Sequence, residues 1–165
     1  MTDMLVSEAK ARLRPELVAS GSTYTITRAA DPDAAYEPIL QRLLAFNAAA
    51  MGEAGGTPFA LVIHEPGTET ICGGLWALSL WGSFYVALVI APDDARGHGL
   101  GTDLMAQAEA EAIQQGCRDI WLDTFAFQAR PFYERLGFEV FAQIDGPPPA
   151  FPRVFMKKLL PRSSP

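Results

Sequence analysis

Residues 84–125 read FYVALVIAPDDARGHGLGTDLMAQAEAEAIQQGCRDIWLDTF. Strand patterns open and close this stretch, at residues 84–90 and 118–125, and each segment has the length of a strand. Between them, apolar residues recur at helical spacing over residues 99–115, and Gly116 suits the end of a helix. A strand, a helix and a strand in this order predict two parallel strands joined by a crossover.

Further strand patterns flank this unit on both sides. They lie at residues 24–28, 59–64 and 70–80 before it, and at residues 138–144 and 153–159 after it. Asp31 followed by Pro32 predicts the start of another helix, with the aspartate as its cap. We therefore expect an α/β (α+β) domain whose central sheet is mixed and mostly antiparallel, with six to seven strands.

The predicted domain occupies residues 23–160. Residues 1–22 are expected to form an N-terminal arm or a short helix, and residues 161–165 a C-terminal tail. Residues 1–10 lack a charged segment followed by an apolar run, and no apolar run is long enough to cross a bilayer. We therefore expect no signal peptide, no membrane partner and a cytoplasmic location.

Composition narrows the range of partners. The chain has 165 residues and a formal net charge of −6, which disfavours nucleic acid because phosphate binding relies on Lys and Arg. An acidic surface can attract a cationic molecule such as an amine. Cys72 and Cys117 form no metal or redox motif, and His64 and His98 are far apart, so we expect no metal site.

The loop before the second predicted helix has the chemistry of an anion site. It reads RGHGLG, residues 96–101. Glycines allow a ligand to approach the backbone, the N–H groups of a helix start attract anions, and Arg96 adds a cation. A tight turn is the simpler interpretation. A dinucleotide fingerprint would require glycine where Thr102 stands, and a Walker A lysine is absent.

A second motif follows the glycine-rich loop, and the two motifs are more specific together than either is alone. Residues 128–138 read QARPFYERLGF. The pattern R-x-x-G-x-G at a helix start, followed after the next strand by A-x-x-F-Y-E-x-L-G-F, resembles the GNAT superfamily of N-acetyltransferases. The resemblance covers about residues 24–159. It implies that the parallel strands splay apart to leave a V-shaped gap, with helices on both faces of the sheet.

The resemblance also implies acetyl-CoA as cosubstrate and a set of residues that bind it. The glycine-rich loop would hold the pyrophosphate, and the strand before it would pair its backbone with the pantetheine arm. The family often has an asparagine where Ala126 stands, and Gln128 is a candidate to replace it. The coenzyme-binding candidates are Leu88, Val89, Ile90, Arg96, Gly97, His98, Gly99, Leu100, Gly101, Thr102 and Gln128.

Tyr133 is the implied general acid. An amine attacks the thioester to give a tetrahedral intermediate, a backbone N–H holds the oxyanion, and a phenol protonates the leaving thiolate. The alternative is a core aromatic residue packed with Phe132 and Leu136. For the general base the candidates are Glu53, Asp93 and Asp123, or a water molecule held by backbone carbonyl groups.

Aromatic residues crowd one predicted hairpin, and the same types recur beside the gap. Core packing is the first interpretation, and an exposed subset could line an acceptor pocket or form a dimer interface. The residues concerned are Trp76, Trp81, Phe84 and Tyr85 in the hairpin, with Phe125 and Phe127 near the gap.

We therefore expect an enzyme that moves an acetyl group from acetyl-CoA to the amine of a small molecule. A protein N-terminal or lysine acetyltransferase, a non-catalytic acyl-CoA-binding or interaction domain, and a nucleotide-dependent oxidoreductase are the alternatives. The family resemblance favours a homodimer.

Overall fold

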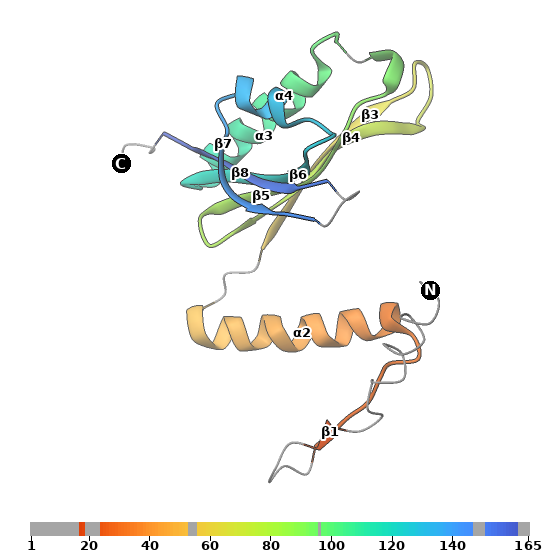
Figure 1. Cartoon of the computed structure of the whole chain (residues 1–165), viewed down its shortest axis with the longest axis vertical. Coiled ribbons are helices and arrows are strands. Elements are labelled where there is room, and N and C mark those ends of the chain that lie inside the picture. Colours follow the sequence, from red (N-terminus) through yellow and green to blue (C-terminus); the bar gives the residue numbers. More distant parts are fainter. Residues whose placement is uncertain (1–16, 19–23, 53–55, 96, 147–150, 162–165) are drawn as a thin grey trace. The chain divides into compact units, whose positions relative to one another are not determined.

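The computed structural model describes residues 17–18, 24–52, 56–95, 97–146 and 151–161 (Figure 1). By its internal contacts the chain divides into two compact units, residues 1–52 and residues 53–165. Each unit has its own secondary structure. Arg96 and Glu53, two of the residues predicted for the site, lie outside the described residues. The short helix expected in the N-terminal arm, around residues 5–17, also lies outside them except for Leu17, which belongs to a strand instead.

The described residues of the first unit form one long helix and a small strand pair. Strand β1 (Leu17–Val18) lies antiparallel to β2 (Thr25–Ile26). Strand β2 falls within residues 24–28, which the sequence predicts to be a strand. Helix α2 (Pro32–Met51) begins where the sequence predicts, because Oδ1 of Asp31 accepts hydrogen bonds from the N–H groups of Asp33 and Ala34 at 3.0 and 3.2 Å. The helix ends at Gly52.

The second unit is built on a six-stranded sheet with the order β3-β4-β5-β6-β8-β7. Only β5 and β6 run parallel, and the other neighbours are antiparallel, which confirms the predicted mixed sheet and its strand number. The strands are β3 (Thr57–His64), β4 (Ile71–Leu80), β5 (Ser83–Ile90), β6 (Asp119–Phe125), β7 (Glu139–Ile144) and β8 (Arg153–Leu159).

Two helices cover one face of this sheet (Figure 1). Helix α3 (Leu100–Gln114) joins β5 to β6, and α4 (Arg130–Arg135) joins β6 to β7. A 3-10 turn, η1 (Asp93–Ala95), precedes α3. Helix α3 buries the apolar side that its periodicity predicts, and both helices share one hydrophobic core with alternate residues of β5, β6 and β8. Members of this core include Phe84, Val86, Leu104, Ala108, Ile120, Leu122, Tyr133, Val154 and Met156.

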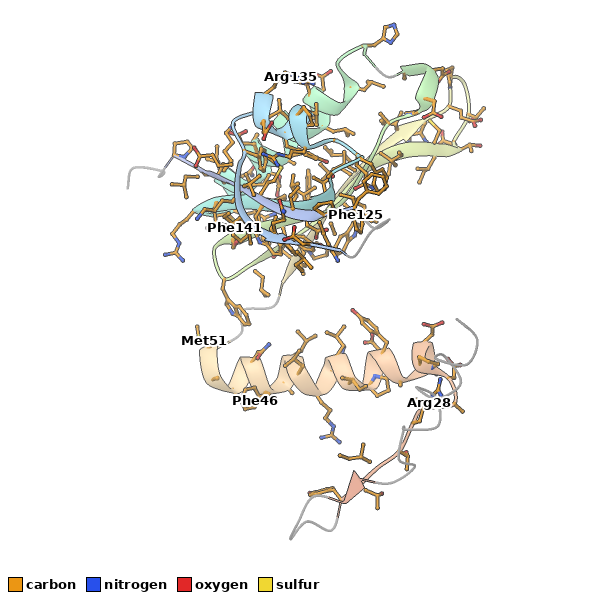
Figure 2. The ribbon with its side chains drawn as sticks, viewed as in Figure 1. Arg28, Phe46, Met51, Phe125, Arg135 and Phe141 are labelled. Carbon is orange, nitrogen blue, oxygen red and sulfur yellow. The ribbon has the colours of Figure 1, made fainter. Side chains whose placement is uncertain are left out.

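The other face of the sheet carries the alternate residues of the same strands. Tyr85 and Trp121 stack there with ring centroids 4.2 Å apart. The ring centroids of Phe141 and Phe155 are 6.3 Å apart. Figure 2 shows Phe141 and Phe125 across the sheet from Arg135 of α4. The family resemblance implies helices on both faces of the sheet, and α3 and α4 are the helices on the first face.

No helix among the described residues is both long and apolar enough to span a bilayer.

Candidate active site

The site begins where the parallel strands separate. Strands β5 and β6 pair from Ser83 with Asp119 to Val86 with Leu122, and no pairing between them follows. At this point β5 has a bulge, because Trp76 of β4 pairs with Leu88 while the next residue of β4 pairs with Val86. A bulge bends a strand and increases its twist, which turns the end of β5 away from β6.

The gap opens into a cleft of about 950 Å³. Its walls come from the end of β5, the start of α3, the end of β6 and the segment that leads into α4. Residues 86–91, 99–102, 122–124 and 127–129 line it, together with Ala95, Gly97, Phe132, Tyr133 and Arg135. The structure therefore gathers both sequence motifs around one cavity, of a size usual for a ligand site.

The glycine-rich loop presents a helix start to this cleft. Gly97 and Gly99 have φ values of +80° and +91°, which glycine adopts at no steric cost. Gly99 caps α3 and has no side chain to bond the first N–H groups of the helix. These groups carry the positive end of the helix dipole and suit an anion.

Gly101 and Thr102 lie in the first turn of α3, where this loop runs into the helix. A Cβ at position 101 would lie 3.3 Å from Cζ of Phe132, so Gly101 lets the start of α3 approach α4 closely. Thr102 lines the cleft in the first turn of the helix. His98 belongs to the same turn of chain but is not among the residues that line the cleft.

Strand β5 offers its free edge to the cleft. On one side, residues 88–90 pair with residues 74–76 of β4. On the other side, the edge that β6 would occupy is open from Ala87 onward among the described residues. Backbone N–H and C=O groups on an open edge are ready to pair with an extended ligand that carries amides. This is the geometry expected for Leu88, Val89 and Ile90.

Tyr133 is a buried residue that still reaches the cleft. Its exposed fraction is 7%, and its ring packs edge-on against Phe132 and Phe138 at centroid distances of 5.1 and 5.9 Å. Burial raises the pKa of its phenol, so the hydroxyl stays protonated through the physiological range. The two interpretations of Tyr133, core residue and proton donor, therefore do not exclude each other.

Gln128 closes the turn at the end of β6. Its Oε1 accepts hydrogen bonds from the backbone N–H of Phe125 at 2.9 Å and from Oγ1 of Thr124 at 3.1 Å. Thr124 is 4% exposed, and Gln128 is exposed and lines the cleft. Because Oε1 is committed to the turn, the amide nitrogen is the end of the side chain that can donate to a ligand.

Asp123 stands at the point where the strands part. Its Oδ1 accepts a hydrogen bond from the Tyr85 hydroxyl at 3.2 Å, and its Oδ2 accepts one from Nε of Arg153 at 2.6 Å. Burial, together with the charge of Asp123, raises the pKa of Tyr85, which therefore remains a donor. Both oxygens of the predicted base are thus already engaged.

Comparison with known proteins agrees with this geometry. The sequence profile described as the Acetyltransferase (GNAT) family matches residues 22–138. The chain belongs to the GNAT family of acetyltransferases. An acetyltransferase of Agrobacterium fabrum is 33% identical over 115 residues, which make up 70% of this chain and 82% of that protein. Both the predicted family and the predicted fold class are confirmed.

Two further relatives support the assignment. Blasticidin-S acetyltransferase of Streptomyces morookaense is 38% identical over 91 residues, 54% of this chain and 67% of that protein. The crystal structure of a protein assigned as an acetyltransferase from Agrobacterium tumefaciens superposes with a TM-score of 0.74. That structure is 28% identical in sequence, and the match covers 84% of this chain and all of the other.

Within this GNAT chain, the candidates for the base differ in position. Asp123 lines the cleft, whereas Asp93 lies in η1 and is not among the lining residues. No group of three or more His, Cys, Asp or Glu side chains that could hold a metal occurs in the described part of the chain.

Sequence reasoning did not single out Arg153 or Thr124 as site residues. Arg153 is 30 positions from Asp123, and the two meet because β8 pairs with β6. The two-residue alternation in β6 could have placed Trp121, Asp123 and Phe125 on one face. Which strand lies beside β6, and in which register, has no local signal in the sequence.

Proposed function

We propose that this chain is an N-acetyltransferase that moves the acetyl group of acetyl-CoA to the amine of a small molecule. The observation that carries the proposal is the cleft between the diverging strands β5 and β6, which is lined by a glycine-rich helix start, an open strand edge and Tyr133. The relative in Streptomyces morookaense is named for a small-molecule acceptor, blasticidin S, which favours an acceptor of that class.

Binding of the cosubstrate would use backbone groups more than side chains. Gly97, Gly99 and the first turn of α3, including Leu100, Gly101 and Thr102, would face the pyrophosphate, with His98 and Arg96 beside them. The open edge of β5, from Leu88 to Ile90, would pair with the amides of the pantetheine arm. One N–H group of this edge would then lie near the thioester oxygen.

Acetyl-CoA, when bound, supplies an activated carbonyl carbon that an amine can attack directly, with release of a thiol. The chain's own groups would do three things in this reaction. A backbone N–H of β5 would stabilise the negative charge on the carbonyl oxygen. The Tyr133 hydroxyl would give its proton to the departing sulfur. The walls of the cleft would exclude water and hold the two reactants together.

The first experiment is a thermal unfolding measurement with acetyl-CoA, with NADH and ATP as controls. A ligand that binds only the folded state, at about 100 times its Kd, adds about 2.7 kcal/mol to the free energy of unfolding. For a domain of this size we expect Tm to rise by about 5–10 °C with acetyl-CoA. An absence of any shift at saturating acetyl-CoA, or an equal shift with NADH, would contradict the proposal.

Gln128 provides a test of the coenzyme contact. Gln128→Glu keeps an oxygen that can accept from Phe125 N–H and Thr124, but removes the amide N–H donor. We expect Tm within about 2 °C of the wild type and an acetyl-CoA affinity several-fold lower, since a lost hydrogen bond costs about 1 kcal/mol. Calorimetric titration measures the affinity. Gln128→Ala should lower both Tm and the affinity for acetyl-CoA. Unchanged acetyl-CoA affinity in Gln128→Glu would contradict a role of Gln128 in coenzyme binding.

A further inference from the structure

Three phenylalanines form an exposed cluster beside the cleft, here called the aromatic rim. They are Phe125, Phe127 and Phe151, with exposed fractions of 38%, 59% and 55%. Phe125 and Phe127 stack with centroids 5.7 Å apart and planes 18° apart, and Phe151 meets Phe127 edge-on at 4.9 Å. By contrast, Phe84 in the core of the same unit has no exposed surface.

The rim is a built feature, because two distant segments are held together there. Phe125 pairs with Arg153 at the end of the β6–β8 ladder. Just beyond it, the N–H of Ala126 donates to the carbonyl of Pro152 at 2.9 Å. These backbone contacts hold residues 125–126 beside residues 152–153, and this pairing brings the three rings close to one another.

The rim is continuous with the proposed reaction site. Phe127 lines the same cleft as Asp123 and Tyr133. A small molecule whose amine reaches into this cleft would therefore have its remaining atoms beside the rings. Contact with another aromatic ring, in stacked or edge-on geometry, is energetically favourable for exposed aromatic side chains.

A guanidinium adjoins the rim. Arg153 places its Cζ 5.9 Å from the ring centre of Phe125 and 5.6 Å from that of Phe155. Its Nε is bonded to Asp123, which fixes the plane of the group, and its side chain remains 45% exposed. Among the described residues, neither terminal nitrogen has a hydrogen-bond partner. Two parallel N–H donors on a fixed guanidinium match a carboxylate.

We propose that the aromatic rim and Arg153 form the acceptor-recognition site, and that the acceptor is a small amine carrying both an aromatic ring and a carboxylate. Chemically this is an aromatic amino acid or a close relative. The inference rests on the proposed acetyltransferase function. Such a zwitterion also has no net charge, so the acidic balance of the chain, −6, does not repel it.

The reaction at this site is ordinary amide formation. The ammonium of the acceptor first gives one proton to water. The neutral amine nitrogen then forms a bond to the thioester carbon, the C–S bond breaks with its electron pair going to sulfur, and the nitrogen loses a second proton. The thiolate gains one proton, so the products are the N-acetyl amino acid and the free thiol.

The test measures thiol release from acetyl-CoA with phenylalanine, alanine and phenylalaninamide, using the full chain. Alanine lacks the ring, and the amide lacks the carboxylate. We expect kcat/KM for phenylalanine to exceed that for alanine by at least about 10-fold, in line with ring contacts and buried apolar area. Equal values for phenylalanine and alanine would overturn the proposal.

Matched variants assign the preference to the rim. Phe127→Leu keeps an apolar side chain but removes the ring, and should narrow the phenylalanine preference to about 3-fold or less. Phe141→Leu is the control, because Phe141 is also an exposed phenylalanine, at 50%, but lies on β7 outside the residues that line the cleft. The same narrowing in both variants would overturn the role of the rim.

Arg153→Lys tests the carboxylate contact. Lysine keeps the charge beside Asp123 but lacks the fork of donors. The ratio of kcat/KM for phenylalanine to that for phenylalaninamide should fall several-fold, and comparing the ratio between proteins cancels the different basicity of the two amines. An unchanged ratio would overturn the role of Arg153. If alanine and phenylalanine react equally, only this inference fails, whereas absence of thiol release with every amine tested contradicts the proposed function itself.

Discussion

Replacing Tyr133 by phenylalanine is expected to lower kcat by about 100-fold while acetyl-CoA affinity stays within about 2-fold of the wild type. The substitution removes only the hydroxyl, and the ring contacts with Phe132 and Phe138 remain. A proton donor acts when the C–S bond breaks, so its loss appears in turnover rather than in binding. Steady-state kinetics of thiol release and a calorimetric titration measure the two quantities.

The control for this variant is a change in packing that keeps the hydroxyl. Phe138→Leu removes a buried ring next to Tyr133 and should lower Tm, with kcat near the wild-type value at temperatures where the protein is folded. Equal kcat in Tyr133→Phe and the wild type would show that the thiolate leaves without this acid. Tyr133 would then be a core aromatic residue alone.

The raised pKa of Tyr133 adds a second readout. Burial favours the neutral phenol in the folded protein, so the folded state binds this proton more tightly than the unfolded state. The resulting contribution to stability is complete below the unfolded pKa of about 10 and is lost as pH rises through the higher folded pKa. Tyr133→Phe should therefore lose less stability than the wild type in alkaline solution.

The sequence predicted elements whose signals are local. Asp31 caps α2 as expected, and the helical spacing in residues 99–115 gives the buried side of α3. The two strands around that helix are parallel, as the strand–helix–strand order predicts. The two motifs face one cleft, at Gly99 and Tyr133 among others, which only the family resemblance anticipated.

Features that depend on pairing between distant strands had no such signal. The last two strands, β7 and β8, pair antiparallel, and the order β6-β8-β7 places β8 between β6 and β7. That order brings Arg153 to Asp123 and Phe151 to Phe127, and both contacts belong to the proposed acceptor site. No periodicity within one segment encodes the register of another.

Gly74 shows a similar limit, because its role is visible only in the sheet. It lies buried in the middle of β4, pairs with Val62 and Ile90, and has a φ of +148°. A Cβ at this position would lie 2.2 Å from the carbonyl oxygen of Leu61. Backbone of a paired strand cannot move aside as the tip of a side chain can, so the sheet itself would have to separate.

Gly74→Ala is therefore expected to lower the free energy of unfolding by more than about 3 kcal/mol and Tm by more than about 6 °C. Gly67→Ala is the matched control, since Gly67 also has a positive φ, +73°, but a Cβ there would meet nothing within 4 Å. Backbone strain alone should cost that variant about 1 kcal/mol. Because Gly74 pairs with the end of β5, acetyl-CoA affinity should also fall in Gly74→Ala and not in Gly67→Ala. Thermal unfolding of Gly74→Ala and Gly67→Ala, measured side by side, tests this prediction. Similar Tm values would mean that β3 and β4 accommodate the added methyl group while the sheet stays intact.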